Sequence, residues 1–113
     1  MRPQIVHLEL HTPDLTGASA FYRQLLGWAP ETVVTRWWPY VSIDAGISAG
    51  IVTCGTPLPV WIPYVEVVDV DVATDRAISL GATTVLAPRA GPHGRRSVVR
   101  SAGGGDLAFW QES

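Results

Sequence analysis

Residues 5–12 alternate between apolar and polar side chains, and this period of two predicts a β-strand. The apolar positions of the strand are Val6, Leu8 and Leu10. The polar positions are His7, Glu9 and His11. Polar neighbours on one strand face lie about 6.5 to 7 Å apart, so these three side chains can act together.

A helix is predicted directly after this strand. Its apolar residues recur at helical spacing, at Ala18, Phe21, Tyr22, Leu25 and Leu26. Thr12 or Asp14 is placed to cap the helix N-terminus, and Gly27 is placed to end it.

The rest of the first half predicts three strands, over residues 32–36, 37–43 and 47–53, and then a linker over residues 55–59. The second half begins again with a strand over residues 63–70. A helix follows from Val72 to Leu80 and is ended by Gly81. The later strands are predicted over residues 83–86, 97–100 and 107–111, with a loop over residues 88–94 and a turn at residues 103–105.

The chain therefore contains an internal repeat, which is a strong indication of fold. Superposing the halves places His7 on Tyr64, Glu9 on Glu66, His11 on Val68 and Asp14 on Asp71. It also places residues 105–109 on residues 46–50, so that Phe109 falls on Gly50.

Several short motifs resemble the vicinal oxygen chelate superfamily, which includes glyoxalases, bleomycin resistance proteins and extradiol dioxygenases. Residues 6–10, 12–15, 21–22 and 26–28 resemble the opening of its first module. Residues 61–65, 68–71, 80–82, 94–95 and 109–111, with Pro88, resemble its second module. The resemblance implies an α+β fold with two tandem βαβββ modules, a curled mixed sheet around a cavity and helices outside. We expect one domain, residues 1–113, with module one at residues 1–57 and module two at residues 58–113.

The resemblance also implies positions for metal ligands on the first and last strands of the modules. His7 occupies the first of these positions and is a competent ligand. The other positions fall on Tyr64 and Phe109, and a phenyl ring supplies no donor for a divalent metal. We therefore expect no metal cofactor. If a divalent metal does bind, His7 and Glu9 are its expected ligands.

Acid/base chemistry is a second interpretation of the polar positions, with His7, Glu9 and Glu66 as candidate catalytic residues. Glu9 and Glu66 are related by the repeat, and two carboxylates in an apolar cavity would raise at least one carboxyl pKa. Alternatively, the glutamates pair with arginines or face water, and His11 lies near solvent at the strand end.

The candidate ligand-binding residues are the aromatic and polar side chains expected in the cavity. They are His11, Trp38, Tyr40, Trp61, Tyr64, Arg95 and Phe109. Aromatic rings would hold a flat ligand by stacking, and Arg95 would hold an anionic group. Trp28 and Trp110 are expected to pack in the core or at an interface.

Composition narrows the classes of partner. The net charge is -2, which gives no electrostatic reason to expect binding to nucleic acid or to anionic membranes. Cys54 is the only cysteine, so an intramolecular disulfide is excluded. The sequence shows neither a signal peptide nor a membrane-spanning run, and we expect a cytoplasmic homodimer.

Together these features favour metal-independent binding of an apolar or aromatic small molecule between the modules, as in antibiotic or metabolite sequestration. The alternative is an acid/base lyase, isomerase or cyclase acting on a natural-product intermediate. A second alternative is a divalent-metal enzyme with an atypical site. The sequence does not decide whether the protein is an enzyme.

Overall fold

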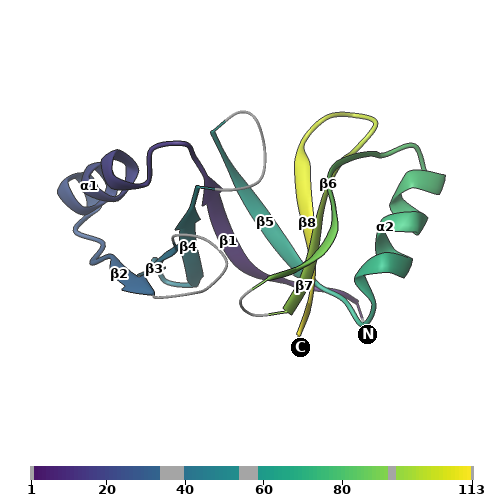
Figure 1. The fold of residues 1–113 in the computed structure, drawn as a ribbon, viewed down its shortest axis with the longest axis horizontal. Coiled ribbons are helices and arrows are strands. Elements are labelled where there is room, and N and C mark those ends of the chain that lie inside the picture. Colours follow the sequence, from purple (N-terminus) through teal and green to yellow (C-terminus); the bar gives the residue numbers. More distant parts are fainter. Residues whose placement is uncertain (1, 34–39, 54–58, 92–93, 113) are drawn as a thin grey trace. The chain divides into compact units, whose positions relative to one another are not determined.

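The computed structural model describes residues 2–33, 40–53, 59–91 and 94–112 (Figure 1). Trp37, Trp38, Cys54 and His93 lie outside these ranges. Contacts within the chain divide it into a first unit, residues 7–61, and a second unit, residues 2–6 with residues 62–112.

The described residues form two helices and eight strands, which confirms the predicted α+β class. The first module contains β1 (Ile5–His11), α1 (Leu15–Leu26), β2 (Glu31–Val33), β3 (Tyr40–Asp44) and β4 (Ser48–Val52). The second module contains β5 (Val60–Glu66), α2 (Val70–Ser79), β6 (Thr83–Gly91), β7 (Gly94–Arg100) and β8 (Asp106–Glu112). Both modules thus have the predicted βαβββ order.

The sheet of the first unit has the strand order β2-β3-β4-β1. β1 and β4 pair in parallel, and the other pairs are antiparallel. Alternation buries one face of this sheet against α1. The core on that face consists of Leu10, Val41, Ile43, Ala49 and Ile51, with Leu15, Ala18 and Tyr22 of the helix packed against it.

The sheet of the second unit has the equivalent order β5-β8-β7-β6, with β5 and β8 parallel. α2 runs along β6, β7 and β8 (Figure 1). Two side-chain contacts show which face it covers. Thr74 of α2 contacts Ser97 of β7 through their hydroxyl oxygens at 2.7 Å, and the backbone N–H of Val70 donates to the Gln111 side chain of β8.

The helix ends follow the predicted chemistry with one shift. Asp14 caps α1 by accepting from the backbone N–H of Gly17, and Gly27 ends it at φ 72°, a conformation that suits glycine. α2 is capped by Asp69, so Asp71 lies in its first turn.

One prediction about these elements is wrong. Residues 88–94 were expected to form a loop, but β6 continues to Gly91 and β7 begins at Gly94, because the strands pair as far as these residues. The helical spacing of Phe21, Leu25 and Leu26 is confirmed, and each of these side chains is more than half exposed. The α1 contact with the sheet is narrower than the apolar pattern of the helix.

The strand registers also correct the superposition of the two halves. Glu9 pairs with Gly50 in the first unit, and Glu66 pairs with Trp110 in the second. Trp110 is therefore the counterpart of Gly50, and Ala108 the counterpart of Ser48. The predicted alignment was displaced by one residue, and such a slip moves a side chain to the other face of a strand.

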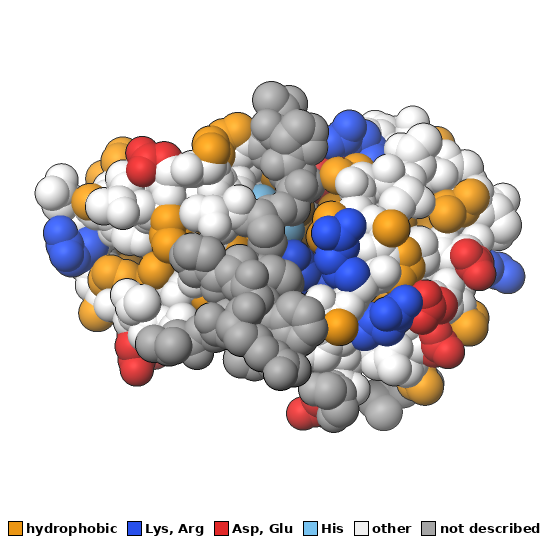
Figure 2. Space-filling view, viewed as in Figure 1, with side chains coloured by type: hydrophobic (Ala, Val, Ile, Leu, Met, Phe, Trp, Pro, Cys, Tyr) orange, Lys and Arg blue, Asp and Glu red, His pale blue; other side chains and the backbone are white. Residues whose placement is uncertain are grey.

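No helix among the described residues is long and apolar enough to span a membrane. Basic and acidic side chains lie next to each other on the face seen in Figure 2. Two bidentate ion pairs occur among the described residues, Arg95 with Asp71 and Arg100 with Asp106.

Candidate functional site

The sheet face of the first unit that α1 does not cover carries most of the predicted polar residues. β1 contributes His7, Glu9 and His11 to it. The register brings β4 alongside, with Gly50 beside Glu9 and Val52 beside His11. The prediction that these three polar side chains share one face is confirmed by their mutual contacts.

His7 is held by both nitrogens of its ring. Its Nδ1 lies 2.7 Å from the Ser48 hydroxyl oxygen, and its Nε2 lies 2.9 Å from Glu9 Oε2. A carboxylate can only accept, so Nε2 donates to Glu9, and in the neutral ring Nδ1 then accepts from Ser48. The contact with Glu9 therefore fixes which nitrogen faces Ser48.

Glu9 lies between two histidines. Its Oε1 is 3.4 Å from Nε2 of His11, and the Glu9 residue is only 6% exposed. Burial raises the pKa of the Glu9 carboxyl, but hydrogen bonds from His11 and His7 and the charges of their rings outweigh burial and lower this pKa to about 2. The predicted rise in pKa does not occur at Glu9, which is an ionised carboxylate near neutral pH.

His11 is 1% exposed, so the alternative that placed it near solvent is wrong. The pairing of β1 with β4 continues past His11, where the Thr12 N–H donates to the Val52 carbonyl of β4. His11 is thus an internal partner of Glu9.

Tyr40 of β3 lies across the neighbouring strand from this cluster. Its ring and hydroxyl occupy the space where a side chain at Gly50 would project, so glycine at that position makes room for the ring. Burial, together with the nearby Glu9 charge, raises the pKa of the Tyr40 phenol above its usual value. Tyr40 is therefore a protonated, buried hydroxyl beside an ionised carboxylate.

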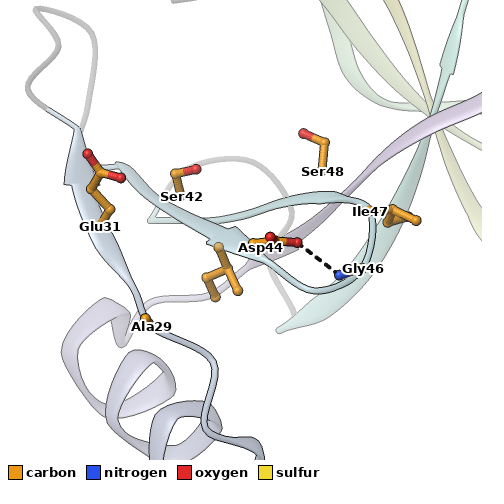
Figure 3. Close-up of a pocket in the computed structure, with 8 residues that line it drawn as sticks. Ala29, Glu31, Ser42, Asp44, Gly46, Ile47 and Ser48 are labelled. Carbon is orange, nitrogen blue, oxygen red and sulfur yellow. Dashed lines mark hydrogen bonds between the residues drawn. The ribbon is translucent and has the colours of Figure 1, made fainter.

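A pocket of about 390 Å³ opens next to Ser48 in the first unit (Figure 3). It is lined by Ala29, Glu31, Ser42, Ile43, Asp44, Gly46, Ile47 and Ser48. Two carboxylates and two hydroxyls make the lining polar. Asp44 also accepts from the backbone N–H of Gly46, which fixes the turn between β3 and β4.

The residues do not fit the metal site that the superfamily resemblance implies. Both ring nitrogens of His7 are turned to Ser48 and Glu9, and both oxygens of Glu9 are turned to histidines. Among the described residues, no three His, Cys, Asp or Glu side chains are arranged to hold a metal ion.

The second unit carries a different polar group on the corresponding face. Arg96 of β7 is 5% exposed and donates through Nη1 to the Tyr64 hydroxyl of β5 at 2.9 Å. Glu66 is exposed. Ala108 lies beside Tyr64 in the register, so this unit has a methyl group where the first unit has the Ser48 hydroxyl.

Two predicted ligand-binding residues of the second unit lie on its helix-covered face instead. Phe109 pairs with Ser97, which contacts α2, and it therefore points to the same side. Arg95 forms an ion pair with Asp71 in the first turn of α2. Both differences have the same cause, because successive residues of a strand point to opposite faces. Phe109 on β8 and Arg95 on β7 are each one residue away from a position that faces away from α2.

Trp61 and Trp38 are the remaining predicted ligand-binding residues. The Trp61 indole N–H donates to the Tyr22 hydroxyl at 2.9 Å, and its ring packs edge to face on Tyr22 and Trp28. Trp61 thus belongs to the core contacts of α1, as was expected for Trp28. Trp38 lies outside the described residues.

Neither Ser48 nor Arg96 was among the predicted site residues. The signal for Ser48 was its position two residues before Gly50, on the strand parallel to β1. The signal for Arg96 was strand alternation with Val98, which the glycine and proline content of residues 88–94 obscured.

No family model matches the chain. A protein named "Putative glyoxylase CFP32", from Mycobacterium bovis and Mycobacterium tuberculosis, is 26% identical over 114 residues that cover 92% of this chain. The chain spans 44% of the length of these curated relatives.

Solved structures of several proteins share the fold. A methylmalonyl-CoA epimerase in complex with methylmalonyl-CoA superposes over 100% of this chain and 96% of its own, with a TM-score of 0.65 and 16% identity. A variant of the Streptomyces coelicolor epimerase, in complex with 2-nitronate-propionyl-CoA, covers 97% of both chains with a TM-score of 0.64 and 16% identity. A hypothetical protein from Bacillus halodurans covers 100% and 96%, with a TM-score of 0.69 and 11% identity.

Proposed function

We propose that this protein, which has the fold of the vicinal oxygen chelate superfamily, binds a small molecule without a metal ion. The binding surface is the helix-free face of the first unit. The observation that carries this proposal is the engagement of both His7 nitrogens, by Ser48 and by Glu9. A metal could use His7 only after one of these hydrogen bonds was broken.

The ligand that suits this face has an apolar or aromatic body and one polar group. Tyr40 places a buried aromatic ring beside the cluster, and Glu9 with its two histidines places charge and hydrogen-bonding groups there. The epimerase structures that share the fold hold small molecules, methylmalonyl-CoA and 2-nitronate-propionyl-CoA, which supports a small-molecule role.

The metal-free proposal is tested by calorimetric titration of chelator-treated protein with Zn²⁺, Mn²⁺ and Co²⁺. We expect no stoichiometric binding. The Ser48→Ala variant is the matched control, because it releases Nδ1 of His7 while leaving the other residues in place. Tight binding of one ion by the unmodified protein would contradict the proposal, and binding by Ser48→Ala alone would support it.

Acid/base catalysis, as in a lyase, isomerase or cyclase, is the second candidate. It is favoured by the burial of an ionised Glu9 between two histidines, which would hold His7 in place as the group that accepts or donates a proton. Such a group suits proton transfer next to a carbonyl, and the names of the relatives include epimerases and a glyoxylase. Glu66, exposed in the second unit, remains a predicted catalytic residue.

The acid/base candidate is tested with methylmalonyl-CoA as a probe, by following exchange of its α-hydrogen in D₂O by NMR. This candidate predicts exchange that is lost in Glu9→Gln and in His7→Ala. Exchange retained in Glu9→Gln would remove Glu9 from the mechanism, and exchange lost in Glu66→Gln would restore the predicted pair. Probe binding without exchange would favour binding alone.

We also propose that the protein forms a homodimer. The exposed apolar side chains of α1, Phe21, Leu25 and Leu26, supply surface that a second copy would cover. Sedimentation at micromolar concentration tests this, and a monomer there would contradict it.

A further inference from the structure

Ser48, His7 and Glu9, whose contacts engage both nitrogens of His7, also form a continuous chain of hydrogen bonds from a hydroxyl to a carboxylate. The Ser48 hydroxyl is 2.7 Å from Nδ1 of His7, and Nε2 of His7 is 2.9 Å from the Glu9 carboxylate. A hydroxyl, a base and a group that orients the base, at these distances, are the parts of an activated nucleophile.

The three residues differ in exposure in the order that such a chain needs. Ser48 is exposed at the start of β4 and lines the pocket of about 390 Å³ (Figure 3). His7 is half-buried behind it, and Glu9 is buried behind His7. A reactant in the pocket would therefore meet the hydroxyl first.

The backbone fixes this order. β1 and β4 are parallel neighbours, with Leu8 paired with Ala49 and Glu9 with Gly50, so Ser48 lies beside His7. Nε2 of His7 donates to the Glu9 carboxylate, which leaves Nδ1 as the acceptor that faces the serine. The tautomer that a general base needs is thus selected by a buried hydrogen bond.

We propose that Ser48 is a nucleophile that accepts the acyl group of a small ester or thioester, with His7 as its base and Glu9 as a positioning residue. This proposal rests on the metal-free site described above, because a metal ion on His7 would take the nitrogen that Ser48 needs.

The reaction proceeds in two balanced stages. Ser48 Oγ attacks the carbonyl carbon while its proton passes to Nδ1 of His7, and the tetrahedral intermediate expels the alcohol or thiol, which takes that proton. Water then adds to the acyl carbon with His7 accepting its proton. The proton returns to Ser48 Oγ as the acid leaves.

The pocket lining defines the class of ester. Glu31 and Asp44 place two carboxylates in it, and Ser42 adds a hydroxyl. Negative charge in the pocket disfavours anionic substrates through like-charge repulsion, and it favours neutral or cationic ones. The volume suits a small molecule.

The first test uses the full chain and the neutral ester 4-nitrophenyl acetate. We expect a burst of one nitrophenolate per chain and one acetyl group on Ser48, located by peptide mass mapping. The anionic 4-nitrophenyl hemisuccinate should react about 10-fold more slowly, an estimate for one like-charge contact. Acetyl found only on Ser42, Tyr40 or His7 would overturn the proposal.

Variants separate the roles of the residues. Ser48→Ala should abolish the burst, and Ser79→Ala, which removes an exposed hydroxyl at the end of α2, should leave it unchanged. Ser48→Cys should accept the acetyl group again, which guards against misfolding of the alanine variant. A burst that persists in Ser48→Ala would overturn the proposal.

Glu9→Gln tests the positioning role. It should lower the maximal acetylation rate by about 100-fold, the usual contribution of general base catalysis, and leave the half-saturating ester concentration unchanged. An unchanged rate would show that Glu9 plays no such role. Absence of acetylation together with absence of metal binding would remove the nucleophile and leave the metal-free site intact, whereas tight metal binding would remove both.

Discussion

The helix-free faces of the two units have the same backbone plan and different chemistry. In the first unit His7, Glu9 and Ser48 occupy neighbouring register positions, and Glu9 is buried. In the second unit the same positions hold Tyr64, Glu66 and Ala108, and Glu66 is exposed. The two halves thus share the directions in which equivalent side chains point, but the residues at these positions differ in chemistry.

The comparison also shows how each unit places charge on its sheet. The first unit buries a carboxylate and places it within 2.9 and 3.4 Å of two histidine rings on the same strand. The second buries a guanidinium and hydrogen-bonds it to a phenol on another strand. Only the first arrangement combines a buried charge with a titratable base and a neighbouring hydroxyl.

The largest expected effect comes from removing the buried charge. Glu9→Leu should lower the free energy of unfolding by about 3 kcal/mol, because it leaves two histidines without their shared partner in a buried place. Glu66→Leu, the matched change in the second unit, should alter it by less than about 0.5 kcal/mol. Urea denaturation measures the free energy of unfolding of both variants. Similar effects of the two substitutions would contradict the proposed difference between the units.

Lowering the pH should also reveal the contribution of the buried Glu9 carboxylate. The Glu9 pKa lies at about 2 in the folded chain against an ordinary 4.5, so its contribution is complete above pH 4.5 and is lost as pH falls toward 2. Between pH 5 and pH 2 the unmodified protein should lose about 3 kcal/mol more stability than Glu9→Gln. Parallel acid profiles for the two proteins would rule out this role of Glu9.

The close approach of Tyr40 to Gly50 gives a smaller effect. Gly50→Ala places a methyl group where the Tyr40 ring and hydroxyl lie, and it should cost about 1 to 3 kcal/mol by overpacking. In a Tyr40→Phe background the cost should fall, since the hydroxyl is the nearest atom. Thermal unfolding of the four proteins in this cycle measures the coupling, and additive effects would contradict the contact.

The smallest expected effect is one that the two units share. Asp14→Ala and Asp69→Ala each remove a carboxylate that accepts a backbone N–H at a helix start, and each should cost about 1 kcal/mol. Asp75→Ala, an exposed change within α2, is the control and should cost less. Strongly unequal effects of the two caps would show that the repeat does not extend to its helix ends.

The sequence by itself determined the order of elements in both modules. Strand alternation, capping aspartates and Gly27 are local signals, and the structure places the helices and strands close to where these signals predicted them. The shared face of His7, Glu9 and His11 was also predictable, because alternation within one strand needs no knowledge of its neighbours.

Only the tertiary structure decided what lies beside that face. The pairing of β1 with β4 brings Ser48 to His7, and the pairing of β5 with β8 sets Ala108, not Phe109, beside Tyr64. Register between distant strands depends on long-range packing, and an error of one residue exchanges the two faces. The pKa of Glu9 was decided in the same way: burial alone would raise it, and the histidines that the fold brings within hydrogen-bonding distance lower it.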